Sequence, residues 1–82
     1  MRVLVVEDES YLADAIALGL RRETMAVDIA EDGAEALATI GAVQPDLVVM
    51  DVMMPRLDGL AATRDVLALD APPRVVVLTT FD

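Results

Sequence analysis

The strongest constraint on the fold is a set of short apolar runs that do not alternate with polar residues. Three such runs, Val3–Val6, Leu47–Met50 and Val75–Leu78, are mostly β-branched. Runs of this kind are typical of strands buried on both faces, as in a parallel sheet that helices cover on each side. A fourth run, Ala26–Ala30, contains Asp28 and alternates, which predicts an edge strand with one wetter face.

Helical patterns fill the gaps between these runs, with apolar residues recurring every three or four positions. The stripe residues are Leu12, Ala15, Ile16, Gly19 and Leu20 in the first helix, Ala34, Leu37, Ala38 and Gly41 in the second, and Ala62, Thr63, Val66 and Leu67 in the third. Asp32 and Glu35 predict a capping box at the start of the second helix. The third helix should begin at Asp58 or Gly59.

This alternation predicts a single α/β domain over residues 1–82, with the order β-α-β-α-β-α-β and right-handed crossovers. A doubly wound sheet would place its strands in the order 2-1-3-4. In that order the first helix lies on one face of the sheet, and the second and third helices lie on the other.

Composition excludes several classes of function. Six Arg and no Lys oppose fifteen acidic residues, and a net charge of −9 argues against a nucleic-acid or anionic membrane surface in this stretch. The absence of Cys and His excludes disulfides, thiolate or imidazole metal sites, and nucleophiles activated by His. The sequence is 56% hydrophobic, which excludes disorder, and it shows no membrane span or signal peptide, so we expect a cytoplasmic protein without membrane contact.

Acidic residues follow the ends of two of the predicted strands. Glu7-Asp8-Glu9 follows the first apolar run, and Asp51 follows the third. If those strands are neighbours, Glu7, Asp8 and Asp51 converge beyond the carboxyl end of the sheet, where their repulsion raises pKa values. Mg²⁺ would relieve the conflict and could hold a phosphoryl group. A lone acid after a strand is more often a helix cap or a solvated charge, so the pattern alone leaves both interpretations open.

Three segments together resemble a bacterial response-regulator receiver domain of the CheY-like kind. They are Val5–Glu9, Pro45–Gly59 and Val75–Thr80, and the resemblance covers the whole chain. It implies a flavodoxin-like fold and an aspartyl-phosphate switch driven by a sensor histidine kinase. It implies a regulatory phosphoacceptor that supports only its own phosphotransfer and dephosphorylation, not an enzyme with a separate substrate.

The resemblance also assigns roles to single residues. Asp51 would be the phosphoacceptor that attacks the phosphorus of a phosphohistidine. Asp8 would bind Mg²⁺ directly, Glu7 would do so directly or through water, and Asp51 would supply a third carboxylate. The backbone carbonyl of Met53 would complete the protein ligands, and Thr79 would be the switch hydroxyl that bonds the phosphoryl oxygen.

Two further residues would shape the loop that follows the third strand. By resemblance these are Pro55 and Gly59, and Gly59 could adopt a positive φ there without penalty. Thr80 competes with Thr79 as the switch hydroxyl, but Thr79 directly follows the apolar run and suits the family better.

Receiver domains carry a fifth strand with a Lys that pairs with the phosphoryl group. This sequence ends after the fourth strand and contains no Lys, so residues 1–82 should be an incomplete receiver domain. We expect the fourth strand to present an apolar edge. The protein should therefore be longer, or should pair this strand with another chain as a homo-oligomer or strand-exchanged dimer.

Other functions remain as alternatives. The leading one is a pseudo-receiver, or assembly module, that signals through protein contacts without phosphorylation, and the lack of Lys favours it. A haloacid-dehalogenase-type phosphatase is disfavoured because Met53 occupies the place of the general acid, and the glycines form no nucleotide-binding motif. By resemblance, an attached output domain would make the intact protein a DNA-binding transcription regulator.

Overall fold

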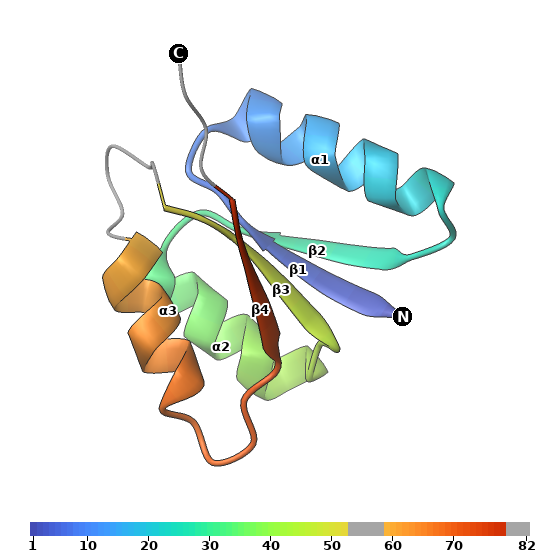
Figure 1. The fold of residues 1–82 in the computed structure, drawn as a ribbon. Coiled ribbons are helices and arrows are strands. Elements are labelled where there is room, and N and C mark those ends of the chain that lie inside the picture. Colours follow the sequence, from blue (N-terminus) through green and yellow to red (C-terminus); the bar gives the residue numbers. More distant parts are fainter. Residues whose placement is uncertain (53–58, 79–82) are drawn as a thin grey trace.

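The computed structural model describes residues 1–52 and 59–78 as one parallel sheet with helices on both faces. The strands are β1 (Arg2–Val6), β2 (Ala26–Ala30), β3 (Leu47–Asp51) and β4 (Arg74–Leu78), and the helices are α1 (Ser10–Arg22), α2 (Gly33–Val43) and α3 (Gly59–Leu67). The strand order is β2-β1-β3-β4 and all pairs are parallel (Figure 1). The predicted α/β class, element order and strand order are therefore confirmed.

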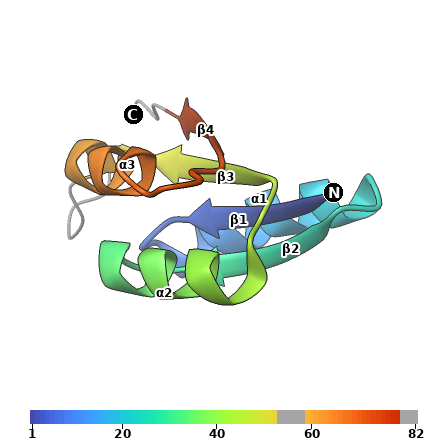
Figure 2. The same cartoon turned by 90° about the horizontal axis from the view of Figure 1, so that it is seen from below.

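The sheet separates two apolar layers, with α1 on one face and α2 and α3 on the other (Figure 2). The buried residues on the α2 and α3 face are Leu4, Val6, Ala30, Ala36, Ile40, Val48, Met50, Ala62 and Val66. On the α1 face, Val3, Val5 and Val49 are buried, and Ile16 and Leu20 pack against them. Successive residues of β1 and β3 thus point into opposite layers, which is why both strands read as continuous apolar runs.

The predicted stripes of the first two helices are confirmed only in part, because Ile16 and Leu20 of α1 pack against the core but other members do not. In α1 the buried residues are Ala13 and Ala17, whereas the predicted Ala15 and Gly19 are exposed. Alanine and glycine bury little apolar area, so they fit a core stripe and a solvent face equally well.

The same correction applies to α2, whose buried face is centred on Ala36 and Ile40. The predicted Ala34, Ala38 and Gly41 are exposed, and only Leu37 of that stripe packs against the core. In α3 the prediction is closer. Ala62 and Val66 are buried and Thr63 is half-buried, but Leu67 remains 54% exposed.

The predicted capping residues begin α2. The backbone N–H of Glu35 donates to Oδ1 of Asp32 at 2.7 Å, which confirms Asp32 as the N-cap. The carboxylate of Glu35 accepts from the backbone N–H of Glu31 at 3.1 Å, one residue before the cap. These bonds tie the end of β2 to the first turn of α2.

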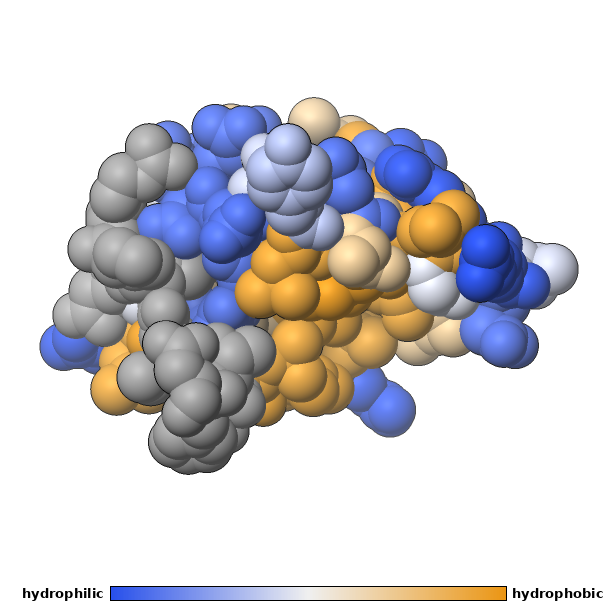
Figure 3. All heavy atoms as spheres, turned by 90° about the horizontal axis from the view of Figure 1, so that it is seen from above, coloured by the Kyte–Doolittle hydropathy of each residue, from blue (hydrophilic) through white to orange (hydrophobic). Residues whose placement is uncertain are grey.

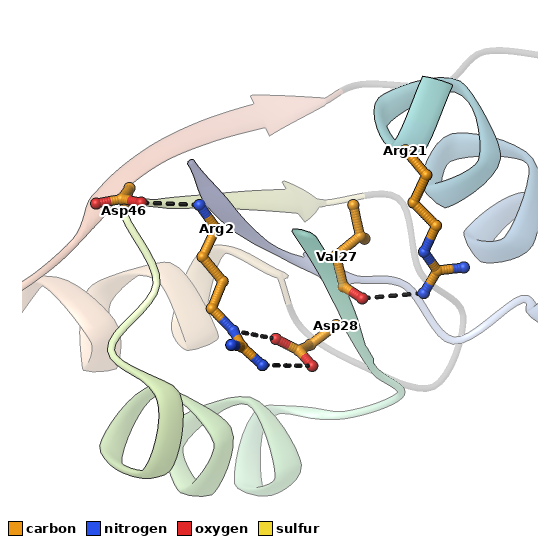
Figure 4. A network of polar contacts seen from close by, with 5 residues as sticks. All are labelled: Arg2, Arg21, Val27, Asp28 and Asp46. Carbon is orange, nitrogen blue, oxygen red and sulfur yellow. Dashed lines mark hydrogen bonds and ion pairs between the residues drawn. The ribbon is translucent and has the colours of Figure 1, made fainter. Parts of the chain in front are cut away.

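Polar contacts fix the strands at the end of the sheet where they begin (Figure 4). The Nε of Arg2 donates to Oδ2 of Asp28 on β2 at 2.9 Å, and its backbone N–H donates to Oδ2 of Asp46 at 2.8 Å. Arg21 donates to the carbonyl of Val27 at 2.9 Å. Arg2 therefore links β1 to both of its neighbours, and Asp28 occupies the wetter position predicted for the edge strand.

The other edge strand, β4, is largely uncovered. Val76 is 46% and Val77 is 42% exposed, although they point to opposite faces of the sheet. Figure 3, which views the α1 side, shows apolar surface beside α1. The predicted apolar edge is present, and its pairing with another strand stays a prediction.

We expect the replacement of Gly19 by Ala to raise the free energy of unfolding by about 1 kcal/mol, because Gly is that much less favourable than Ala inside a helix. Gly19 is exposed, and a Cβ added there meets nothing within 4 Å. Urea denaturation of the full chain measures the change. Ala15→Gly, on the same exposed surface of α1, is the matched control and should lower stability by a similar amount.

Candidate functional site

Buried acids lie at the end of the sheet where the strands finish. Glu7 directly follows β1 and Asp51 is the last residue of β3. Val6 and Met50 are register partners, so Glu7 and Asp51 occupy adjacent positions on neighbouring parallel strands. Glu7 is 2%, Asp8 is 9% and Asp51 is 3% exposed. Carboxylates are rarely buried this deeply, so three of them at one end of the sheet indicate a site and not three solvated loop charges.

The surroundings of Glu7 raise the pKa of its carboxyl group. Burial is the main effect that raises its pKa, to about 7, and a side-chain hydrogen bond with Asp51 raises it further. The negative charges of Asp51 and Asp8 act in the same direction, whereas the hydrogen bond from the backbone of Glu9 opposes them. Near neutral pH Glu7 is therefore protonated in part of the molecules.

One oxygen of Glu7 accepts no hydrogen bond from the protein. Its Oε1 accepts from the backbone N–H of Glu9 at 3.0 Å, but its buried Oε2 accepts from nothing. A buried carboxylate oxygen without a donor is costly unless a cation or a proton satisfies it. The residues therefore fit a hard divalent cation, for which carboxylate oxygen is the preferred ligand.

A complete set of metal ligands is not preformed in the part of the chain that the structure describes. Across residues 1–52 and 59–78, no three acidic side chains are arranged as a metal-binding group. Glu7, Asp8 and Asp51 are thus brought to one end of the sheet, but their joint coordination of one ion requires a change of side-chain conformation. The predicted fourth ligand, the carbonyl of Met53, lies outside the described residues, as do Pro55 and Thr79.

Gly59 approaches the backbone of Asp51 closely. The positive φ predicted for this glycine is wrong, because none of the four glycines has one. The need for glycine is steric instead. A Cβ at residue 59 would lie 2.5 Å from the carbonyl oxygen of Asp51 and 2.6 Å from the Cα of Val52. The first residue of α3 therefore rests directly on the end of β3.

The sequence interpretation missed the acids that surround this site. The backbone N–H of Glu7 donates to the carbonyl of Ala30 at 3.0 Å, so the residues after β2 lie beside those after β1. We define the acidic rim as the exposed residues Glu9, Glu31, Asp32 and Glu35. The signal that could have revealed the rim is the strand order itself, because parallel strands end at the same edge of a sheet.

A hollow in the described structure lies away from these acids. It has a volume of about 390 Å³ and lies between the end of α2 and the connection to β4, lined by Ile40, Gln44 and Pro72 among others. Its lining contains no ionisable side chain. The carboxylate cluster, which is buried and includes Glu7 with its raised pKa, is the better candidate for chemistry.

Comparison with known proteins decides the family. The family model described as the response regulator receiver domain matches residues 3–82. The chain belongs to the response regulator receiver family. This result confirms the family that the three sequence motifs predicted. None of the receiver's helices in the described ranges is long and apolar enough to cross a membrane.

Among curated proteins, the receiver is similar to transcriptional regulators. It is 54% identical over 79 residues to transcriptional regulatory protein CutR of Streptomyces coelicolor, a match that covers 96% of this chain and 36% of CutR. It is 40% identical over 82 residues to response regulator MprA of Mycobacterium avium, covering 100% of this chain and 36% of MprA. The chain thus spans about a third of the length of these relatives.

Solved structures share the receiver's fold. The BeF3-activated N-terminal receiver domain of RstA from Klebsiella pneumoniae superposes with a TM-score of 0.87 at 33% identity, over 100% of this chain and 69% of that one. Response regulator TrrA from Thermotoga maritima, solved in complex with Mg²⁺ and BeF, gives 0.87 at 31% identity, over 98% and 70%. These matches place the sheet order and its three helices in the flavodoxin-like receiver fold.

Proposed function

We propose that Asp51 accepts a phosphoryl group from a sensor histidine kinase and that this modification controls an attached output. The observation that carries the proposal is the buried pair of Glu7 and Asp51, with one oxygen of Glu7 lacking a partner. Helix caps and solvated charges need no such burial. A bound cation would satisfy the buried oxygen of Glu7 that accepts no hydrogen bond from the protein.

Each residue has a defined part in this chemistry. An oxygen of Asp51 forms the new P–O bond while the P–N bond of the donor's phosphohistidine breaks, and the imidazole keeps the electron pair and takes up a proton. Glu7 and Asp8 would hold Mg²⁺, with Asp51 and the carbonyl of Met53. When bound by these residues, Mg²⁺ would supply positive charge beside the phosphoryl group. Gly59 fixes α3 against Asp51, and Thr79 is proposed as the switch hydroxyl.

The relatives support both halves of the proposal. TrrA was solved with Mg²⁺ and BeF, and CutR is named a transcriptional regulatory protein. By analogy, this receiver would act in a cytoplasmic two-component system. Its effect on transcription would pass through a DNA-binding output domain, because the acidic receiver has a net charge of −9 and offers no basic surface of its own.

A phosphorylation-independent assembly module is the second candidate. The observation that favours it is the lack of a preformed group of three acidic metal ligands in the described ranges. The exposed Val76 and Val77 of β4 would then supply the contact surface. The two candidates differ in whether Asp51 is chemically modified.

Phosphorylation by acetyl phosphate separates them. The full chain, incubated with Mg²⁺ and acetyl phosphate, should gain the mass of one phosphoryl group, and Asp51→Asn should gain none. Asp70→Asn, an exposed acid after α3, is the matched control and should be modified like the wild type. An unmodified wild-type chain, or equal modification of Asp51→Asn, would exclude the phosphoacceptor and favour the assembly module.

A further inference from the structure

In the described residues, acids lie at both ends of the strands, whereas the arginines lie at one end only. Acids gather where the strands end, and these are Glu7, Asp8, Asp51 and the rim residues Glu9, Glu31, Asp32 and Glu35. The arginines of the described ranges gather at the opposite end. Arg2 and Arg74 begin strands, whereas Arg21, Arg22 and Arg64 lie in the last turns of helices that run back toward the strand starts. The receiver thus presents a strongly negative surface around Asp51.

Arginines of the described residues do not neutralise the rim. Asp32 and Glu35 accept from the backbone N–H groups of Glu35 and Glu31, which leaves their charge in place. The ion pair shown in Figure 4 instead joins Arg2, the first residue of β1, to Asp28 on β2. Since the four rim side chains are exposed, their field acts on any molecule that approaches Asp51.

The acidic rim lies at the same end of the sheet as the buried carboxylate of Glu7. Its Oε2 accepts no hydrogen bond from the protein and belongs to a side chain that is only 2% exposed. This oxygen lies at the same end of the sheet as the rim, one residue beyond β1. The negative charges of the acidic rim and of this buried carboxylate favour a positively charged partner. A single divalent ion does not balance all of these charges.

The range of this field covers the reacting atoms. Neighbouring strands lie about 4.8 Å apart, so residues that follow β2 stand roughly 10 Å from the end of β3. The Debye length is about 8 Å at physiological ionic strength and about 30 Å at 0.01 M. Rim charges therefore act on a donor at Asp51, and more strongly at low salt.

We propose that the acidic rim selects the phosphoryl donor, favouring a protein whose phosphohistidine is flanked by Arg or Lys over small anionic phosphates and acidic protein donors. This inference rests on the proposed function of Asp51 and adds the charge that its partner must carry. A donor with basic flanks gains attraction to the rim as it docks, whereas a dianionic small donor is repelled by the rim.

Two synthetic peptides test the selection. Each carries one phosphohistidine, with Arg residues on both sides in one peptide and Glu residues in the other. With the full chain, Mg²⁺ and low salt, transfer to Asp51 should be about tenfold faster from the Arg-flanked peptide, and the ratio should fall toward one as salt is added. Equal rates at low salt would overturn the inference.

Matched double variants locate the effect. Glu9→Gln with Glu31→Gln removes two rim charges, and Glu23→Gln with Asp70→Asn removes two exposed acids from the opposite end of the fold. The first pair should reduce the ratio several-fold and speed phosphorylation by acetyl phosphate, whereas the second should leave both unchanged. Equal effects from the two pairs would show that net charge, not the rim, decides. Failure of every donor to modify wild-type Asp51 would overturn the proposed function itself.

Discussion

Replacing Gly59 by Ala should lower the free energy of unfolding by about 3 kcal/mol, which is the range expected when a side chain is forced into a filled site. The added Cβ would lie 2.5 Å from the carbonyl oxygen of Asp51 and 3.1 Å from its carbonyl carbon. Both contacts are with backbone atoms of a buried strand, so neither can move aside as a flexible side chain would. Helix α3 must shift instead, which pulls the buried Ala62 and Val66 away from the sheet.

The sign of the Gly59→Ala effect is diagnostic. Helix propensity alone would stabilise the variant by up to about 1 kcal/mol, so a loss can only come from the contact with β3. Thermal denaturation of the full chain should show a midpoint that is lower by roughly 10–20 °C for the receiver's transition. Gly19→Ala is the control, with the same chemical change at an exposed helical position where stability should rise. Equal shifts for the two variants would refute the steric role of Gly59.

Long-range contacts of this kind set the limit of what the sequence predicts. The need for a glycine at residue 59 was expected, but for its backbone angle and not for its contact with Asp51. Local sequence carries the signal of a turn, whereas the approach of α3 to β3 depends on how the whole helix packs. The same holds for α1 and α2, where Ala13 and Ala36 are buried and Ala15 and Ala34 are exposed. Small residues leave the orientation of a helix to tertiary structure.

The strands and the position of the acids were predictable for the opposite reason. Two apolar runs, Val3–Val6 and Leu47–Met50, are continuous and mostly β-branched. Helices on both faces of these strands could therefore be inferred from the sequence pattern. Once the strand order is known, the parallel sheet brings Glu7 and Asp51 to one edge. The sequence also indicated that such carboxylates would raise pKa values. The structure adds that Glu7 is the acid whose pKa is raised, because this side chain is deeply buried.

Replacing Glu7 by Gln should stabilise the metal-free chain by about 3 kcal/mol at pH 8. Gln resembles the protonated form of Glu7, which the folded state favours. Its amide oxygen can accept from the backbone of Glu9, and its amide nitrogen can donate toward the carboxylate of Asp51. The variant therefore keeps the hydrogen bonds of the protonated acid and removes the buried charge that the wild type bears at high pH.

The gain should depend on pH in a defined direction. The pKa of Glu7 rises from 4.5 to about 7 on folding, so the folded state binds the proton more tightly than the unfolded state. The wild type thus has this stabilisation in full below pH 4.5 and loses it as the pH rises through 7. Because Gln does not titrate, the difference between variant and wild type should be small near pH 4.5, grow toward pH 7, and level off by pH 8.

Urea denaturation in EDTA at a series of pH values measures this difference. Glu31→Gln is the matched control, since Glu31 is exposed and should give a difference that does not vary with pH. Parallel stability curves for Glu7→Gln and the wild type would show that Glu7 bears no buried charge in the folded state.

Adding Mg²⁺ turns the same pair of proteins into a test of the metal site. An ion that binds only the folded state stabilises it by about 2.7 kcal/mol at a hundred times its Kd. The wild type should gain this stabilisation at pH 8, and Glu7→Gln should gain less, because an uncharged amide replaces a carboxylate ligand. The advantage of the variant would then shrink or reverse. A pH-dependent gain in EDTA without any differential response to Mg²⁺ would mean that Glu7 is a buried acid but not a ligand. The pH dependence in EDTA therefore tests the buried charge of Glu7, and the response to Mg²⁺ tests the cation that we propose binds there.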